Sequence, residues 1–151
     1  MYKIAVFSLL VIGVYMMNKK DLPRGIRNNN AGNIENNGIA WNGLSDTQND
    51  DRFYQFISAE YGIRAIAKIL RTYQSKYGIN TVRGIISRWA PPTENNTESY
   101  IQAVSKTLGV IPDEPINVDE HMVGLVNSII THENGYNPYS MGTILDGIAL
   151  A

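Results

Sequence analysis

The sequence predicts an all-α domain that follows a short apolar segment at the N-terminus. Two observations support this fold class. Five segments between residues 58 and 151 carry apolar side chains at intervals of three and four residues, which places those side chains on one face of a helix. Four of these segments end near a glycine or a proline, and only residues 53–56, Phe-Tyr-Gln-Phe, have the composition of a strand.

The N-terminal segment predicts a membrane anchor. Residues 4–17, IAVFSLLVIGVYMM, contain no charge and lie between Lys3 and the pair Lys19-Lys20. The stretch is shorter than the roughly twenty apolar residues that span a bilayer, but lysine side chains at its ends can reach the headgroups. It lacks the small residues of a signal-peptide cleavage site. We therefore expect an uncleaved transmembrane anchor over residues 1–20 and one domain over 21–151; the alternative is a buried core helix.

Residues 18–57 are expected to be mostly irregular. Residues 18–27 have the composition of a linker, and residues 28–51 are rich in Asn and Gly, which favours turns. Trp41 and Leu44 are large apolar residues inside this loop, so part of it must pack or bind something. A long loop on a helical domain often lines a site, although a plain surface loop is the alternative.

The five helices follow in order along the chain. They are expected from 58 to 78, from about 81 to 90, from 97 to 109, from about 119 to 134 and from about 140 onward. Ser58 and Thr97 have the side chains of N-caps. Gly78 and Gly109 are expected to close the first and third helices, and two consecutive prolines stop the second.

Composition excludes several kinds of chemistry. The net charge of -1 gives no electrostatic reason to expect nucleic acid as a partner. There are no cysteines and two histidines, so a cysteine nucleophile is excluded and a histidine-rich metal site is not expected. We expect no cofactor and no metal. Acid–base chemistry by carboxylates remains as the main catalytic option.

Glu133 stands out among the carboxylates. At 100° per residue it falls within about 20° of Met122 on the helical wheel, so it continues the apolar stripe of the fourth helix. Burial and the negative end of the helix dipole both favour the protonated form, which is the state that a general acid needs. The alternative is that Glu133 turns out to solvent or pairs with an arginine. Glu60 is the second candidate.

Residues 127–138, NSIITHENGYNP, resemble the signature of lytic transglycosylases, in which an apolar helix ends in the catalytic Glu and a polar residue, a Gly and a Pro follow. Asn134 stands where that family has Ser. The strings RGIRNNNAGNI and RWAPPTENNTESY, together with most of residues 24–148, resemble wall-lytic or structural proteins of bacteriophage virions.

The resemblance implies a small lysozyme-like helical domain that cleaves the β-1,4 bond between N-acetylmuramic acid and N-acetylglucosamine. Glu133 would act as general acid and then as base. Its place at the C-terminal end of the chain would require a permuted version of that fold. The expected substrate-binding residues are Asn30, Asn33, Trp41, Tyr54, Tyr136 and Tyr139, of which the last two would also position Glu133.

The expected partners are peptidoglycan glycan strands, a membrane through residues 4–17, and other virion proteins. The expected location is a membrane-associated place in the virion, reached from the host inner membrane. Lysines and arginines after the anchor leave the domain in the cytoplasm, which suits an enzyme stored there until assembly. Three alternatives stay open: a muramidase-like hydrolase, a non-catalytic structural virion membrane protein with a lysozyme-like fold, and a glycan-binding module.

Overall fold

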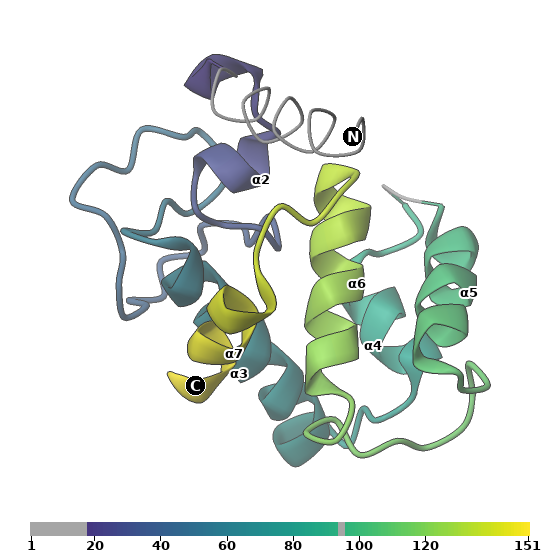
Figure 1. The fold of residues 1–151 in the computed structure, drawn as a ribbon. Coiled ribbons are helices and arrows are strands. Elements are labelled where there is room, and N and C mark those ends of the chain that lie inside the picture. Colours follow the sequence, from purple (N-terminus) through teal and green to yellow (C-terminus); the bar gives the residue numbers. More distant parts are fainter. Residues whose placement is uncertain (1–17, 94–95) are drawn as a thin grey trace, which may run out of the picture.

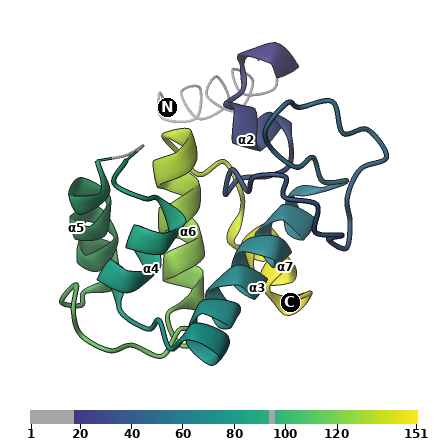
Figure 2. The same ribbon diagram turned by 180° about the vertical axis from the view of Figure 1, so that it is seen from behind.

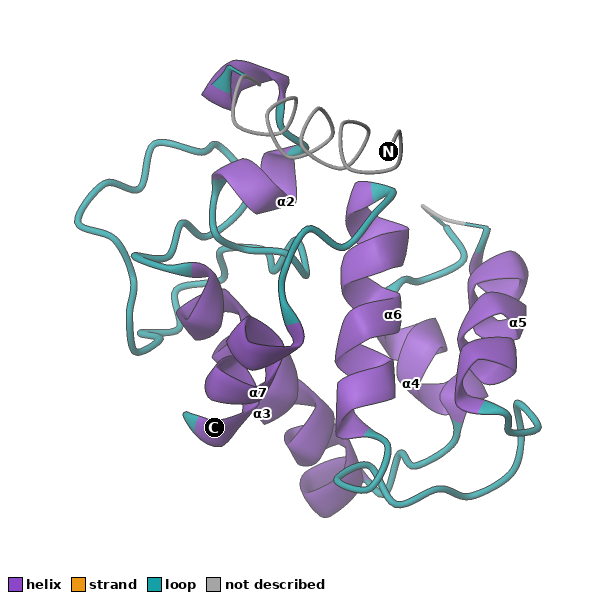
Figure 3. Ribbon diagram, viewed as in Figure 1, coloured by secondary structure: helices purple, strands orange, loops and turns teal. Residues whose placement is uncertain are grey.

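The computed structural model describes residues 18–93 and 96–151 (Figure 1). Its helices are η1 (Lys19–Asp21), α2 (Arg24–Arg27), α3 (Ala59–Tyr77), α4 (Val82–Trp89), α5 (Thr97–Leu108), α6 (Met122–Asn134) and α7 (Met141–Ala149). Figure 3 shows helices and loops with no strand in the described part. The prediction of an all-α domain is confirmed for those residues.

Helix α6 lies at the centre of the domain. It packs against α5 on one side and against α3 and α7 on the other, and both Figure 1 and Figure 2 show it between these groups. Its sequence is apolar around most of its circumference, as a helix surrounded by others requires. Leu125, Val126, Ile129 and Ile130 are all fully buried. The C-terminal end of α6 is therefore fixed from several directions.

Helix ends differ from the predicted ones in two places. The N-cap of α5 is Asn96, whose side chain accepts from the Ser99 backbone, while the Thr97 hydroxyl donates to the Ala90 carbonyl. Helix α6 begins at Met122 rather than near residue 119, because Asn117 holds residues 119–121 in a turn through its side-chain and backbone oxygens. Such local side-chain bonds compete with helix formation.

The prediction that residues 18–27 form a linker is wrong in part. Helix α2 packs on α6, and Gly25 is buried in that contact. A Cβ at Gly25 would lie 2.5 Å from Asn134 Oδ1 and 2.8 Å from Asn33 Oδ1, so this position has no room for a side chain. The predicted anchor over residues 4–17 lies outside the described residues. Among the residues that are described, none of the helices is both long and apolar enough to cross a bilayer.

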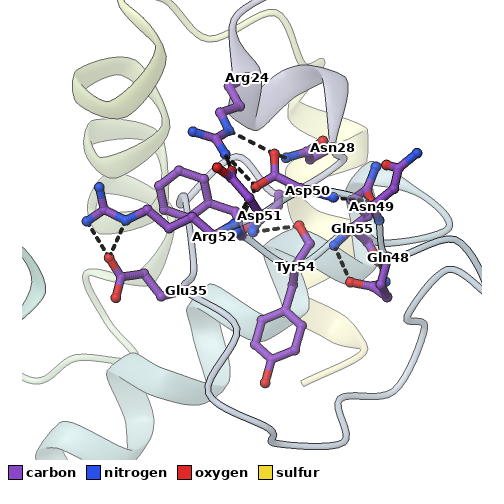
Figure 4. Close-up of polar contacts among 12 residues, drawn as sticks. Arg24, Asn28, Glu35, Gln48, Asn49, Asp50, Asp51, Arg52, Tyr54 and Gln55 are labelled. Carbon is purple, nitrogen blue, oxygen red and sulfur yellow. Dashed lines mark hydrogen bonds and ion pairs between the residues drawn. The ribbon is translucent and has the colours of Figure 1, made fainter.

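The long loop over residues 28–57 is ordered by a buried carboxylate (Figure 4). Asp50 accepts hydrogen bonds from Arg24 at 2.7 and 2.8 Å, from the Asn28 side chain at 2.9 Å, and from the backbone of Arg52 and Phe53. The predicted strand over 53–56 is reduced to two isolated bridges, Glu35–Phe53 and Leu44–Phe56. Here side-chain bonds, rather than a sheet ladder, satisfy much of the backbone.

A small apolar cluster anchors the same loop to α3. Tyr54, Phe56 and Ala65 are its buried members, and Trp41 and Leu44 pack against them. Trp41 and Leu44 therefore pack against other residues of the domain, which is one of the two roles predicted for the large apolar residues of this loop.

Candidate active site

Glu133 lies in the last turn of α6, where its carboxyl group meets residues from two other parts of the chain. Asn33 Nδ2 donates to Glu133 Oε2 at 3.2 Å, and the Tyr100 hydroxyl donates to Oε1 at 3.4 Å. Asn33 comes from the long loop and Tyr100 from α5. The packing of α5 and of the loop around α6 thus places two donors on one carboxyl group.

Burial raises the pKa of Glu133 above its ordinary value, because a charged carboxylate loses its hydration there. The hydrogen bonds from Asn33 and Tyr100, together with the nearby Trp89 side chain, act in the opposite direction and do not cancel this effect. A carboxyl group in this setting stays protonated to higher pH than an exposed glutamate, and it retains donors that stabilise the anion formed when it gives up its proton. That combination is what a general acid uses.

Tyr100 is a fixed neutral donor to this carboxyl group. Its side chain is fully buried, and burial together with the nearby Glu133 raises its pKa far above the usual range. Its ring stacks on His132 with the centroids 3.5 Å apart and the planes within 6°. The phenol therefore keeps its proton to higher pH than an exposed tyrosine, and its orientation is set by packing.

Glu133 forms part of the wall of an open cleft of about 700 Å³, a size typical of small-ligand sites. The wall is contributed by the long loop, by α3, by α4 and the turn after it, and by the end of α6. The residues that matter for chemistry are Asn33, Glu35, Arg52, Phe53, Tyr73, Arg88, Trp89 and Glu133. Aromatic faces next to polar groups suit the binding of sugar rings.

Glu35 is a second carboxylate in this cleft, and the sequence did not single it out. Arg52 Nε donates to Glu35 Oε1 at 2.6 Å, and the Arg52 guanidinium lies 5.0 Å from the Phe53 ring centroid (Figure 4). The bridge between Glu35 and Phe53 brings these residues together. No local pattern reveals such a pairing, because it joins two irregular stretches seventeen positions apart.

Of the four loop residues predicted to contact sugar, Asn33 lies in the cleft. Asn30 is fully buried, and its amide group bonds to the backbone of Ile34 and Tyr54. Tyr54 is 2% exposed, and its hydroxyl donates within the loop. Trp41 packs in the small apolar cluster. These three residues shape the loop that carries Asn33.

The remaining candidates lie elsewhere. Tyr136 is 40% exposed and Tyr139 packs against the main core; neither lines the cleft. Burial raises the pKa of Tyr139 to about 12. Glu60, in the first turn of α3, is not a cleft residue either. Trp89 and Tyr73 pack against the main core and also form part of the cleft wall.

The described residues contain no group of three or more His, Asp or Glu side chains placed to hold a metal ion. The chemistry available in the cleft is that of carboxyl groups, amides, guanidinium groups and aromatic rings.

Comparison with known proteins gives one informative relative. No family model matches the chain. The chain is similar to a protein called Protein P5 from Pseudoalteromonas phage PM2, with 38% identity over 147 residues. The matched region covers 95% of this chain and 91% of the relative.

Proposed function

The chain belongs to the family of Protein P5 of Pseudoalteromonas phage PM2, and from this premise we propose that it is a peptidoglycan-cleaving enzyme of the phage particle. The proposed reaction is that of a lytic transglycosylase on the β-1,4 bond between N-acetylmuramic acid and N-acetylglucosamine, on a permuted lysozyme-like domain. The observation that carries the proposal is Glu133, a largely buried carboxyl group with a raised pKa and two directed donors in a cleft of sugar-binding size.

The proposed mechanism uses Glu133 twice. The protonated carboxyl group donates its proton to the glycosidic oxygen, the bond from that oxygen to the anomeric carbon breaks, and positive charge develops on the sugar. Asn33 and Tyr100 stabilise the carboxylate that remains. The carboxylate then accepts the proton of the sugar's own 6-hydroxyl, whose oxygen attacks the anomeric carbon and closes an anhydro ring. No water is consumed, so one carboxyl group is sufficient.

Glu35 supports a second candidate reaction, hydrolysis. It lines the same cleft as Glu133, and in a hydrolase a second carboxylate activates water or acts as a nucleophile. The ion pair with Arg52 restricts the orientation of the Glu35 carboxylate. Mass spectrometry of the products separates the two reactions, because anhydro-muropeptides lack the water that hydrolysis adds.

The decisive test of the enzyme is Glu133→Gln. This change keeps the shape of the side chain and removes the proton donor, so wall-lytic activity should fall by about 10²–10⁴-fold or more while thermal unfolding is preserved. The matched control is Glu60→Gln, which makes the same substitution at a carboxyl group outside the cleft. Activity should be measured as the release of soluble fragments from purified wall. Full activity in the Glu133 variant would end the assignment.

The non-enzymatic alternatives give a different result in the same assay. A structural virion protein would neither bind nor cut wall material, whereas a glycan-binding module would sediment with it and release nothing. Wild-type release of soluble muropeptides would exclude both alternatives.

The proposed location is the phage particle, with residues 4–17 in a membrane and other virion proteins as neighbours.

A further inference from the structure

Arg88 differs from the other arginines of the domain in what surrounds it. It is exposed in the last turn of α4 and lines the cleft. Its guanidinium carbon lies 5.3 Å from the ring centroid of Tyr73 and 4.2 Å from that of Tyr77. Contacts with two aromatic rings orient a guanidinium group without neutralising its positive charge.

Within residues 18–93 and 96–151, each of the other arginines makes a polar contact with a carboxylate or a backbone carbonyl. The first group is Arg24, Arg52, Arg71 and Arg83; the second is Arg27 and Arg64. Arg88 takes part in none of the ion pairs of that region, and its contacts there are with the two tyrosines. Arg88 is exposed and lines the cleft, so its planar guanidinium group retains N–H donors for a carboxylate.

The charge balance of the cleft leads to the same point. Among the described residues that line the cleft, the Glu35 carboxylate pairs with Arg52, whereas the positive charge of Arg88 takes part in no ion pair. A neutral sugar chain offers no anion to pair with the positive charge of Arg88. A substrate that carries an anion beside the sugar does.

The position of Arg88 relative to the acid is set by α4. Trp89, the next residue, lines the same cleft as Glu133 and acts on the pKa of its carboxyl group. Consecutive residues of a helix have Cα atoms about 3.8 Å apart, and their side chains point in directions about 100° apart. Arg88 therefore lies next to Trp89 but points toward the rim of the cleft that α3 forms. Arg88 and Glu133 line the same cleft, so a group attached to a sugar bound at Glu133 shares this cleft with Arg88.

We propose that Arg88 binds a carboxylate of the stem peptide that peptidoglycan carries on the lactyl group of N-acetylmuramic acid. The cleft then selects glycan that bears acidic peptides over the same glycan with neutral ones. This inference rests on the proposed function, because it names the substrate class of the same cleft. Guanidinium is suited to the task, since it forms two parallel hydrogen bonds with one carboxylate.

The test is a binding measurement by calorimetry with a soluble disaccharide–tetrapeptide and with the same molecule after its carboxyl groups have been converted to primary amides. The wild type should bind the acidic ligand about tenfold more tightly than the amidated one, as expected for a charge-assisted hydrogen bond. Arg88→Gln should remove this preference by weakening the binding of the acidic ligand to the level of the amidated one. Arg88→Lys should keep part of the preference, because it keeps the charge but not the fork.

The matched control is Arg71→Gln, which removes an arginine that pairs with Asp119 and does not line the cleft. It should leave both affinities unchanged. Equal binding of the two ligands by the wild type would overturn the inference, whatever the stability of the variants. So would a loss of affinity in Arg88→Gln that is the same for both ligands.

Binding also separates this inference from the proposed function. If the wild type releases nothing from wall material, the enzymatic proposal fails, while the difference in affinity between the two ligands still decides the role of Arg88. If the wild type cleaves wall but shows no preference for the acidic ligand, the enzyme stands and the inference fails.

Discussion

The polar groups around Glu133 are coupled to the shape of the backbone that carries them. Asn33 adopts a left-handed conformation with φ of 50°, which asparagine tolerates better than most residues. Its amide bonds to the Glu133 carboxyl group, and its oxygen lies close to Gly25. The side chain that tunes the acid is thus held by its own backbone and by the tight contact with α2.

Replacement of Asn33 should change the pH dependence of activity. Asn33→Gly keeps the left-handed backbone and removes a donor that favours the ionised form of Glu133, so the pKa of Glu133 should rise further. Activity needs the protonated acid and is lost as pH rises through this pKa, so the alkaline limb of the pH–rate profile should move to higher pH. The rate at the optimum should fall by about tenfold, because the anion formed in the reaction loses a hydrogen bond.

The control for this experiment is Asn29→Gly. Asn29 also has a left-handed backbone, with φ of 51°, but its side chain bonds to the Phe56 carbonyl rather than to Glu133. Its pH–rate profile should match that of the wild type. An unmoved alkaline limb in Asn33→Gly would show that Asn33 does not tune the acid.

Two neighbouring aspartates test which residues order the loop. Asp50→Asn should destabilise the domain by about 2 kcal/mol, because its side chain is 7% exposed and its carboxylate accepts five hydrogen bonds that an amide cannot all replace. Asp51→Asn also removes a partner of Arg24 but at 88% exposure, and should change stability by less than about 0.5 kcal/mol. Urea unfolding measures both.

The same pair predicts a pH effect with a definite sign. The pKa of Asp50 is lowered in the folded state, chiefly by the hydrogen bond from Arg24, so its stabilising effect is present above the ordinary pKa of an aspartate and is lost as pH falls below it. The stability difference between the wild type and Asp50→Asn should therefore shrink under acid conditions. A difference that stays constant down to low pH would contradict the role given to this carboxylate.

At the scale of elements, two glycines of α7 have opposite expected effects. A Cβ at Gly147 would lie 2.6 Å from Ile63 Cβ and 2.9 Å from the Glu60 carbonyl, so Gly147→Ala should push α7 away from α3 at a cost of about 1–3 kcal/mol. A Cβ at Gly142 would meet nothing closer than Ser140 Oγ at 3.7 Å, so Gly142→Ala should stabilise α7 by up to about 1 kcal/mol. Equal effects in denaturant unfolding would show that α7 is not closely docked.

The helices were largely predictable from sequence because their signals are local. Apolar spacing located α3 to α7, and Gly78 and Gly109 close their helices in left-handed conformations as expected. Glu133 was found for the same reason, since its place on the apolar face of α6 depends only on spacing along one helix. The turn before α6 was missed because Asn117 competes for the backbone there.

The rest of the site depends on contacts between distant parts of the chain. Asn33 and Glu133 are separated by 100 positions, and Tyr100 and Glu133 by 33. The asparagine-rich composition indicated turns, but it did not show which amide would face the acid and which, like that of Asn30, would hold the loop together. The place of Glu35 in the cleft likewise depends on how the irregular stretches around residues 35 and 52 meet. The place of Arg88 depends on where the C-terminal end of α4 lies.

At the scale of the whole molecule, the described residues before α2 contribute nothing buried. Helix η1 contains no buried residue, whereas Ile26 of α2 packs against the main core. Lys20 accepts one long hydrogen bond, at 3.4 Å, from Arg27. These observations favour a domain that does not need residues 18–21 for folding.

Deletion of residues 1–20 should therefore give a folded, soluble domain that still releases fragments from purified wall, with Glu133→Gln in the truncated chain as the inactive control. The full chain should float with lipid vesicles in a density gradient and the truncated chain should not, because residues 4–17 are the proposed membrane contact. Circular dichroism measures whether the truncated chain is folded, and the wall assay measures whether it is active. A truncated chain that unfolds or aggregates would identify the segment as a core helix, whereas equal flotation of both chains would place the membrane contact on the domain itself.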